Sequence, residues 1–340
     1  VEQEQRYNEG AKHRIIGLTL ETRPDAISPK TIAHMRKQGC TRIELGLQAP
    51  DDAILTLIQR GHTVDEFRRA MYLLRRVGFK VDLHFMPDLP GTTPDHDVDM
   101  YASLFSDISL RPDMVKIYPN TVIPSAELYE WLKDGRYTPY GDKALFDGLR
   151  QMKLATPRYC RISRLIRDIP SEEIRAGNTI TNLREMLSSE LQKRGQKCIC
   201  LRCREISRQQ ALIKKDSPEV LFVDTYETIG GTEYFISLED TDRIAVFGFL
   251  RLRIPHEKGL DTLQWIESVR NEKTERHLRE YFPELKDAAF IRELHVYGQL
   301  LNIGELDSTA SQHRGLGKRL MKEAERIVRE AHFDKVAVIS

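Results

Sequence analysis

Short β-branched runs alternate with amphipathic helical stretches throughout the first half of the chain. This alternation indicates a parallel β-sheet covered by helices, and it therefore restricts the first half to an α/β fold. The expected strands are Arg14–Leu20, Arg42–Leu47, Lys80–Phe85 and Asp113–Tyr118. The expected helices between and after them are Pro29–Gln38, Val64–Val77, Asp95–Phe105 and Lys143–Leu154.

Polar side chains follow or end each of these four expected strands. They are Glu21, Gln48, His84, Lys116 and Tyr118. In barrel enzymes this edge of the sheet carries the active site, so the pattern predicts a site there. A single polar residue at a strand end could instead be a turn residue or a structural hydrogen-bonding group. Four successive strands with the same pattern favour the functional interpretation.

The alternation of strands and helices stops in the second half of the chain. A chain of 340 residues is also long for a single hydrophobic core, which indicates more than one domain. We predict an α/β domain over residues 1–168, a basic connector over 169–215 and an α+β domain over 216–340. The segment His256–Leu285 is charged and helix-prone, and we expect it to be a mobile insertion. The expected strands of an antiparallel sheet are Leu221–Tyr226, Glu233–Leu238, Arg243–Arg253, Ile291–Leu301 and, after a helix, Lys335–Ile339. That expected helix is Gly315–Ala331.

Three of the five cysteines, Cys198, Cys200 and Cys203, are crowded into the connector. Such spacing is typical of a metal site in a reducing compartment rather than of a disulfide framework, and zinc is the metal that we expect. A tetrahedral zinc needs a fourth ligand, which could be Cys160 or a histidine. The alternative is three unmetallated thiols in a loop, since the usual paired Cys-x2-Cys signature is incomplete.

Four arginines, Arg158, Arg161, Arg164 and Arg167, recur at intervals of three before the connector. Because acidic residues are few nearby, this run predicts contacts with the phosphates of RNA. The alternative is a solvated face with salt bridges, which is the usual fate of a charge run. The net charge of the chain is only +1, so any such effect is local.

A glycine-containing loop, Gln312-His313-Arg314-Gly315-Leu316-Gly317, precedes the last expected helix, in which Lys318 follows. Glycines let the backbone approach an anion, and the free N–H groups of a first helical turn bind a pyrophosphate. A helix start that needs only backbone freedom would show the same two glycines.

Motifs in both halves resemble one family, the catalytic subunit of Elongator, which joins a radical-SAM (TIM-like) barrel to a GNAT acetyltransferase domain. The motifs are TLETRPD, GCTRIELGLQ, RGHT, KVDLHFMPDLPG, VKIYP, YCRISRLIRDIP, RELHVYG and QHRGLGKRLMKEAERI. The resemblance implies acetyl-CoA at the glycine loop, with its pantetheine arm paired to the strand containing Glu293, Leu294, His295 and Val296.

The same resemblance implies formation of a carboxymethyl group at carbon 5 of wobble uridine 34 in the tRNA anticodon stem-loop. S-adenosylmethionine and a 4Fe-4S cluster would supply the radical. Lys116 and Tyr118 would lie near the reacting centre, and Glu21, Gln48 and His84 would contact the cosubstrate. The family's Cys-x9-Cys-x2-Cys motif is absent here, and the chain stops at VAVIS, so both ends are expected to be truncated. The connector cysteines lie too far downstream of the barrel strands to replace that motif.

Two other functions remain open at this point. One is a protein lysine acetyltransferase, for which Glu293 is the obvious candidate base. The other is a noncatalytic tRNA-binding scaffold. No stretch approaches the roughly 20 apolar residues that cross a bilayer, so we expect a cytoplasmic protein without a membrane partner. In a bacterial or archaeal member of the family, other Elongator subunits would not be required.

Overall fold

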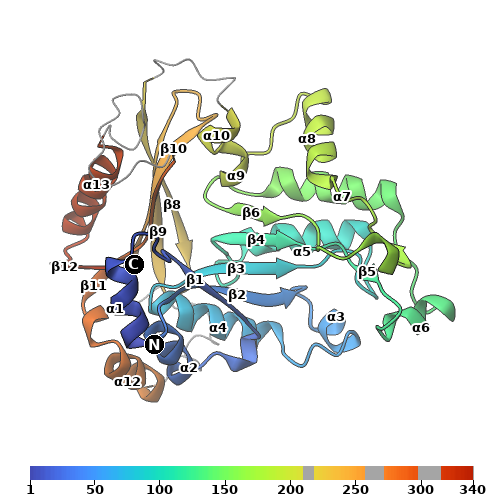
Figure 1. The fold of residues 1–340 in the computed structure, drawn as a ribbon, viewed down its shortest axis with the longest axis horizontal. Helices are drawn as coiled ribbons and strands as arrows, with labels where there is room; N and C mark the ends of the chain where they lie inside the picture. Colours follow the sequence, from blue (N-terminus) through green and yellow to red (C-terminus); the bar gives the residue numbers. More distant parts are fainter. Residues whose placement is uncertain (210–217, 257–271, 298–314, 340) are drawn as a thin grey trace.

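The computed structural model describes residues 1–209, 218–256, 272–297 and 315–339. Two five-stranded sheets lie beside each other, and a small two-stranded pair flanks the first of them (Figure 1). Helices pack on both large sheets. The prediction of an α/β unit followed by an α+β unit is confirmed.

The first sheet is parallel throughout, with the order β1-β2-β3-β4-β6. The sequence prediction placed β1 too early. Its ladder with β2 begins at the pair Leu18 and Cys40, and no strand partner holds residues 14–17. The strands are β1 (Leu18–Thr22), β2 (Cys40–Gln48), β3 (Lys80–Phe85), β4 (Met114–Ile117) and β6 (Arg161–Arg164).

The four predicted helices of the first half are present, and each lies within two residues of its predicted bounds. Local capping explains where one of them begins: the Thr63 hydroxyl accepts the N–H of Glu66, whose carboxylate accepts the N–H of Thr63 at 2.8 Å. The helices are α2 (Pro29–Lys37), α4 (Val64–Arg76), α5 (Pro94–Ser106) and α7 (Asp142–Ala155).

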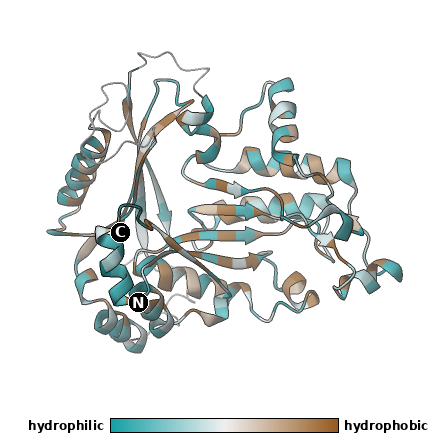
Figure 2. Ribbon diagram, viewed as in Figure 1, coloured by the Kyte–Doolittle hydropathy of each residue, from teal (hydrophilic) through white to brown (hydrophobic). Residues whose placement is uncertain are grey.

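Side chains alternate between the two faces of this sheet, as they must in a strand. On β3, Val81, Leu83 and Phe85 are buried in the apolar core, whereas Asp82 and His84 point to the opposite face. Hydrophobic residues are accordingly concentrated in the strands and on the helix sides that cover them (Figure 2). The opposite face of the sheet is polar.

The smaller elements of the first half and the connector are α1 (Glu2–Gly10), η1 (Pro24–Ala26), α3 (Asp52–Leu57), β5 (Thr121–Val122), α6 (Leu128–Lys133), η2 (Ser171–Glu173), β7 (Ala176–Gly177), α8 (Leu183–Lys193), α9 (Leu201–Arg204) and α10 (Ile206–Gln209). Among them, α3, β5 and α6 lie beyond the carboxyl ends of the strands, whereas α9 and α10 lie near the start of β6 beside the second sheet (Figure 1). The described part of the connector is mainly helical. Cys198 and Cys200 lie between α8 and α9, and Cys203 lies within α9.

The second sheet has the order β12-β11-β10-β9-β8, and α13 (Leu316–Glu330) packs on one face of it. It is not purely antiparallel as predicted, because β12 pairs with β11 in parallel. The last predicted long strand is displaced: β11 starts at Ala288 and ends at Val296. The strands are β8 (Val220–Thr228), β9 (Gly231–Glu239), β10 (Val246–Pro255), β11 (Ala288–Val296) and β12 (Lys335–Val338).

The predicted mobile insertion contains a docked helix. Helix α12 (Glu272–Tyr281) and the short η3 (Pro283–Leu285) pack near α2, with Leu278 and Phe282 buried in the core. The Tyr72 hydroxyl of α4 donates to Glu275 at 2.7 Å. These contacts contradict the prediction of a mobile insertion for this part of it, because buried apolar side chains anchor the helix.

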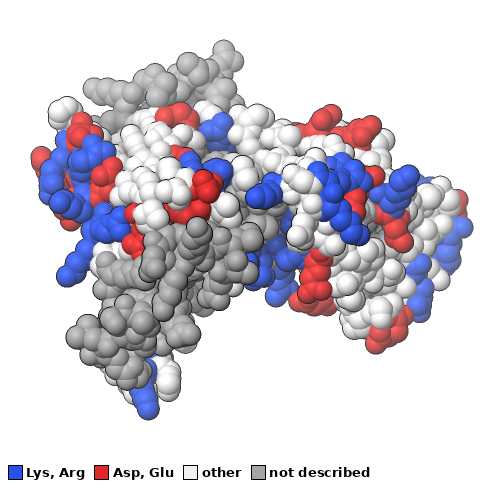
Figure 3. Space-filling model, turned by 90° about the horizontal axis from the view of Figure 1, so that it is seen from above, with Lys and Arg blue, Asp and Glu red and all other residues white. Residues whose placement is uncertain are grey.

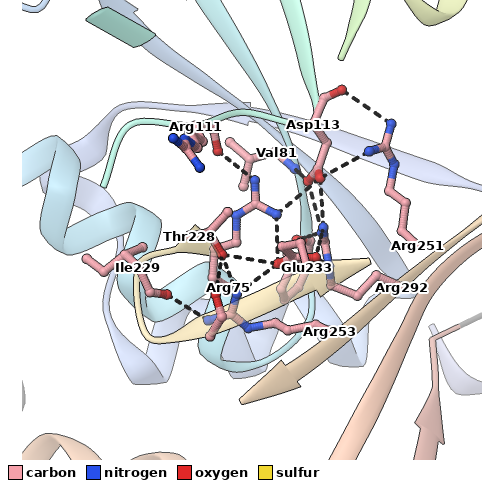
Figure 4. Close-up of polar contacts among 12 residues, drawn as sticks. Arg75, Val81, Arg111, Asp113, Thr228, Ile229, Glu233, Arg251, Arg253 and Arg292 are labelled. Atoms are coloured by element: carbon pink, nitrogen blue, oxygen red, sulfur yellow. Dashed lines mark hydrogen bonds and ion pairs between the residues drawn. The ribbon is translucent and has the colours of Figure 1, made fainter. Parts of the chain in front are cut away.

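A buried charge network joins the two sheets at the amino ends of the parallel strands (Figure 4). Asp113, just before β4, and Glu233, on β9, each accept from the guanidinium of Arg292 at 2.7 Å. Arg75 of α4 also contacts both carboxylates, at 3.1 and 3.3 Å. The network also includes Arg251 and Arg253, whose guanidiniums donate to backbone carbonyls of both units.

None of the helices in the described part of the chain is long and apolar enough to cross a membrane.

Candidate active site at the carboxyl ends of the parallel strands

A cavity of about 690 Å³ opens at the carboxyl ends of β1 to β4. Four of the five residues predicted at this edge line it, namely Glu21, Gln48, His84 and Tyr118. Parallel strands bring their carboxyl ends to one edge, so residues far apart in sequence converge there. Its other lining residues are Leu57, Ile58, Gln59, Arg60, Met86, Leu89, Pro90, Asn120, Glu127, Leu128, Trp131, Arg164, Arg167 and Asp168.

Gln48 ends β2 in a left-handed backbone conformation, with φ of 73°. Its carbonyl accepts the N–H of Met86, which holds this turn in place. The Oε1 atom of Gln48 is buried and has no hydrogen-bond donor among the described residues. A non-glycine residue in this conformation costs free energy and is found often at functional sites. Gln48 therefore presents an unused acceptor in the cavity wall.

His84 lies between two carboxylates, with Nδ1 3.6 Å from Glu21 and Nε2 3.3 Å from Glu44. The edge of its ring also meets Tyr118. Burial lowers the pKa of His84 below its ordinary value, and the two carboxylates oppose this change only in part. Near neutral pH the imidazole is therefore largely uncharged, and it can both donate and accept a hydrogen bond.

Lys116, the fifth predicted residue, does not line the cavity. Its ammonium forms an ion pair with Glu44 on β2, behind the cavity wall. Burial alone would raise the pKa of Glu44, but the hydrogen bond from Lys116 and the nearby His84 hold it below its usual value. Lys116 thus positions Glu44, which in turn contacts His84. The sequence interpretation missed Glu44 because it lies within a strand and not at its end.

Asp82 lies on the same polar face, paired in register with Glu44 on β2. It is buried, its Oδ2 accepts from the Ser163 hydroxyl at 3.0 Å, and its Oδ1 has no partner among the described residues. Burial, reinforced by the Glu44 charge, raises the pKa of Asp82 to about 7. Asp82 is therefore a buried carboxyl group with a raised pKa on the strand face that also carries the cavity residue His84. A period-two pattern of charges on β2 and β3 was the signal in the sequence for both acids.

The structure separates the four arginines of the predicted RNA-binding run. Arg164 and Arg167 line the cavity. Arg161 donates to Glu205 of the connector at 2.8 Å, and Arg158 donates to the carbonyl of Arg243 at 3.0 Å. Arg164 forms an exposed ion pair with Asp168 at 2.6 Å, whereas Arg161 and Arg158 hold neighbouring parts of the chain. The surface in Figure 3 likewise shows basic groups interspersed with acidic ones.

The three connector cysteines come together as predicted, with their sulfur atoms within 4.8 Å of one another. Zinc bound by thiolates at about 2.3 Å would place sulfurs about 3.8 Å apart, so the group is compatible with three corners of a tetrahedron. Cys160, offered as a fourth ligand, is buried but lies outside this group, and no described histidine joins it. None of the five cysteines lines the cavity, so they do not fit a 4Fe-4S cluster at this site.

In the second unit, β11 carries the predicted cofactor strand, Glu293 to Val296. Gly315 precedes α13 with φ of 70°, which only glycine adopts without strain, and Leu316, Gly317 and Lys318 form its first turn. A Cβ at Gly317 would make only an ordinary contact, at 3.9 Å, so internal packing does not require glycine there. Gln312 lies outside the described residues.

Glu293 is already engaged by cations. Its carboxylate accepts from Arg251 at 2.9 Å and lies 3.6 Å from Lys80. Burial would raise the pKa of Glu293, but these two cations hold it below the usual value. A carboxylate stabilised in this way is a weak proton acceptor, which disfavours Glu293 as the base of a lysine acetyltransferase.

Comparison with known proteins defines the class of this protein. The sequence profile of the Radical SAM superfamily matches residues 2–104, and that of the Radical_SAM C-terminal domain matches residues 112–193. The first half is therefore a radical SAM unit. The solved structure of the archaeal Methanocaldococcus infernus Elp3 with an N-terminal deletion is similar to this chain, with a TM-score of 0.84 and 36% sequence identity. The similarity covers all of this chain and 76% of that structure.

The particular family follows from two curated relatives. The tRNA uridine(34) acetyltransferase of Dehalococcoides mccartyi is 39% identical over this whole chain, which covers 70% of that protein. Elongator complex protein 3 of Homo sapiens is 36% identical over 98% of the chain, which covers 58% of that protein. The chain belongs to the family of tRNA uridine(34) acetyltransferases that includes Elongator complex protein 3, as predicted.

Proposed function

We propose that this chain belongs to an enzyme that forms the carboxymethyl group at carbon 5 of wobble uridine 34 in tRNA. The observation that carries the proposal is the convergence of Glu21, Gln48, His84 and Tyr118 in one cavity beside Arg164 and Arg167. Family membership supplies the reaction. Because carbon 5 of uracil is a poor nucleophile, S-adenosylmethionine with its iron–sulfur cluster would supply a radical, and acetyl-CoA the two-carbon unit.

The cavity residues have distinct proposed tasks. Gln48 offers an unused acceptor and His84 a largely neutral imidazole, and both suit the polar groups of a cosubstrate. Tyr118 lies at the cavity wall, where its hydroxyl can meet the uridine. Arg164 and Arg167 lie at the same cavity and would contact tRNA phosphates. Lys116 was predicted from the sequence to lie near the reacting centre. We propose instead that it acts through Glu44 and is a positioning residue.

The second unit would bind acetyl-CoA between β11 and the first turn of α13. The N–H groups of that turn have no partners within the helix, and the helix dipole favours an anion beside them. Gly317 has no side chain although packing would admit one, which leaves room for a pyrophosphate. We further propose that Cys198, Cys200 and Cys203 hold a structural zinc that joins the connector to the barrel.

The test uses the natural full-length protein, since this chain spans 57 to 70% of the length of its curated relatives. Gly317→Glu places a bulky anion at the proposed pyrophosphate site, and we expect it to abolish acetyl-CoA binding in calorimetry. It should leave tRNA affinity unchanged. Lys322→Glu, on an exposed position of the same helix, is the matched control and should bind acetyl-CoA normally.

A lysine acetyltransferase is the competing function. It predicts rapid acetylation of lysine peptides without tRNA and an unaltered anticodon uridine in the presence of S-adenosylmethionine and reductant. That outcome would replace the proposed function. The opposite outcome, tRNA-stimulated thioester opening that is lost in Gly317→Glu, supports the radical tRNA modification.

A further inference from the structure

A buried ammonium group lies beside the cysteine group of the connector. Lys153 occupies the last turn of α7 and is only 1% exposed. Its Nζ lies 3.9 Å from the Sγ of Cys203. Among the described residues, no carboxylate forms an ion pair with Lys153. Sulfur is therefore the acceptor that the fold provides for this charge.

An ammonium removed from water costs several kcal/mol unless a negative partner compensates for it. Three neutral thiols would not compensate, because a thiol is only a weak acceptor. The other nearby cation, Arg184, directs its Nη2 to the backbone carbonyls of Ile162 and Ser163. Negative charge on the sulfur atoms would compensate for the burial of Lys153, and Cys203 is the acceptor within reach of its Nζ.

Charge balance identifies the source of that negative charge. Three thiolates and a neutral fourth ligand around one divalent zinc ion carry a net charge of −1, which the ammonium of Lys153 would neutralise. We propose that Lys153 is the counter-ion of a zinc–thiolate site formed by Cys198, Cys200 and Cys203, and that its charge raises the metal affinity of the site. This inference rests on the zinc site of the proposed function and adds a residue to it.

The position of Lys153 also gives the site a mechanical role. Lys153 belongs to α7 of the barrel unit, whereas the cysteines belong to the connector. The N–H of Leu201, between two of the cysteines, donates to the carbonyl of Cys160 at the start of β6. The metal, its counter-ion and this hydrogen bond together attach the connector to the barrel. Groups that orient or neutralise metal ligands commonly contribute 10- to 100-fold in affinity.

The experiment compares zinc affinity in three variants of the full-length protein, by competition with a chromogenic chelator. Lys153→Met keeps the apolar stem and removes the charge, and we expect about a 10- to 100-fold weaker affinity. Lys153→Arg retains the charge and should recover most of it. Lys143→Met, at an exposed position of the same helix, should match the wild type. Cobalt substitution supplies a second readout, the thiolate-to-metal absorption band.

The outcomes separate this inference from the zinc site itself. If the wild type binds neither zinc nor cobalt, the metal site is wrong. If the wild type binds zinc and Lys153→Met binds it with equal affinity and the same cobalt spectrum, only the role of Lys153 is wrong. A loss in both Lys153→Met and Lys153→Arg, with an intact fold by circular dichroism, would indicate packing in place of charge and would also overturn the inference.

Discussion

The two charged regions of the molecule, at opposite ends of the parallel strands, differ in how completely their charges are paired. At the amino ends, Asp113 and Glu233 are buried and each contacts several arginines (Figure 4). At the carboxyl ends, Glu21 has a side chain that is 65% exposed, and Gln48 lacks a donor among the described residues. Several arginines engage each of the two buried carboxylates and hold the two units together, although the Nε atoms of Arg75 and Arg253 have no hydrogen-bond partner among the described residues. The exposed Glu21 and the acceptor of Gln48 remain for a ligand.

Asp113 and Asp82 are both buried, and the presence or absence of arginine partners decides the difference in their roles. Burial would raise the pKa of Asp113, but Arg292 and Arg75 outweigh it and hold the pKa well below the usual value. The carboxylate therefore remains charged and tied to β11. Asp82 lacks an arginine partner, and burial instead raises its pKa to about 7. The Asp113 carboxylate thus stays charged and stabilises the contact between the two units, whereas the Asp82 carboxyl group titrates.

The largest effect is expected from Arg292→Met, which removes the arginine shared by Asp113 and Glu233. Two buried carboxylates would lose a principal partner, and breaking such a pair costs about 3–5 kcal/mol. Urea unfolding should show this loss in the free energy of unfolding. Arg326→Met, on the exposed face of α13, is the control and should change stability little. Equal effects of the two substitutions would contradict the distinction between the regions.

The second prediction concerns Asp82 and pH. The pKa of Asp82 is about 7 in the folded protein, whereas its ordinary value, which applies to the unfolded chain, is 3.8. Between pH 4 and pH 7 the folded state therefore binds one proton more than the unfolded state. Stability from this group therefore falls as pH rises from 4 to 7, by up to about 1.4 kcal/mol per unit. Asp82→Asn removes this dependence. The difference in unfolding free energy between variant and wild type should grow toward pH 7, and a constant difference would show that Asp82 does not titrate there.

The third prediction tests the cavity as a binding site. His84→Asn should weaken binding of S-adenosylmethionine to the reconstituted full-length protein by about tenfold, since one hydrogen bond to a polar ligand contributes roughly 1–2 kcal/mol. Melting temperature should change little, because His84 is not part of the network between the units. Calorimetry and thermal unfolding measure the two quantities. Unchanged affinity together with a large loss of stability would make His84 structural.

The smallest expected effect is on the salt dependence of tRNA binding, and it distinguishes Arg164 and Arg167 from Arg161. Replacing Arg164 and Arg167 by Gln should flatten the slope of log tRNA affinity against log salt by about one unit per lost phosphate contact. Arg161→Gln breaks its ion pair with Glu205 and should leave the slope unchanged. Filter binding over a range of salt concentrations measures both. A change of slope for Arg161→Gln alone would reverse this assignment.

Much of the barrel half was predictable because its signals are local. β3 was predicted with its observed bounds, and the cavity residues were predicted from their places after strands. β6 was missed because its strand lies within the arginine run, where Ile162 alone carries the apolar side of the pattern. Glu44 was missed because its importance depends on Lys116, 72 residues away. Local patterns do not reveal pairs that only a sheet brings together.

The sequence by itself determined the order of the elements, the family and the residue types that meet at the carboxyl edge, because periodicity and motif spacing are properties of the chain alone. Only the tertiary structure decided which charges are paired. It placed Arg164 and Arg167 at the cavity but Arg161 against Glu205, and Lys153 beside the connector cysteines. The physical reason is that desolvation and Coulomb interaction depend on distances between segments remote in sequence, which no local pattern contains.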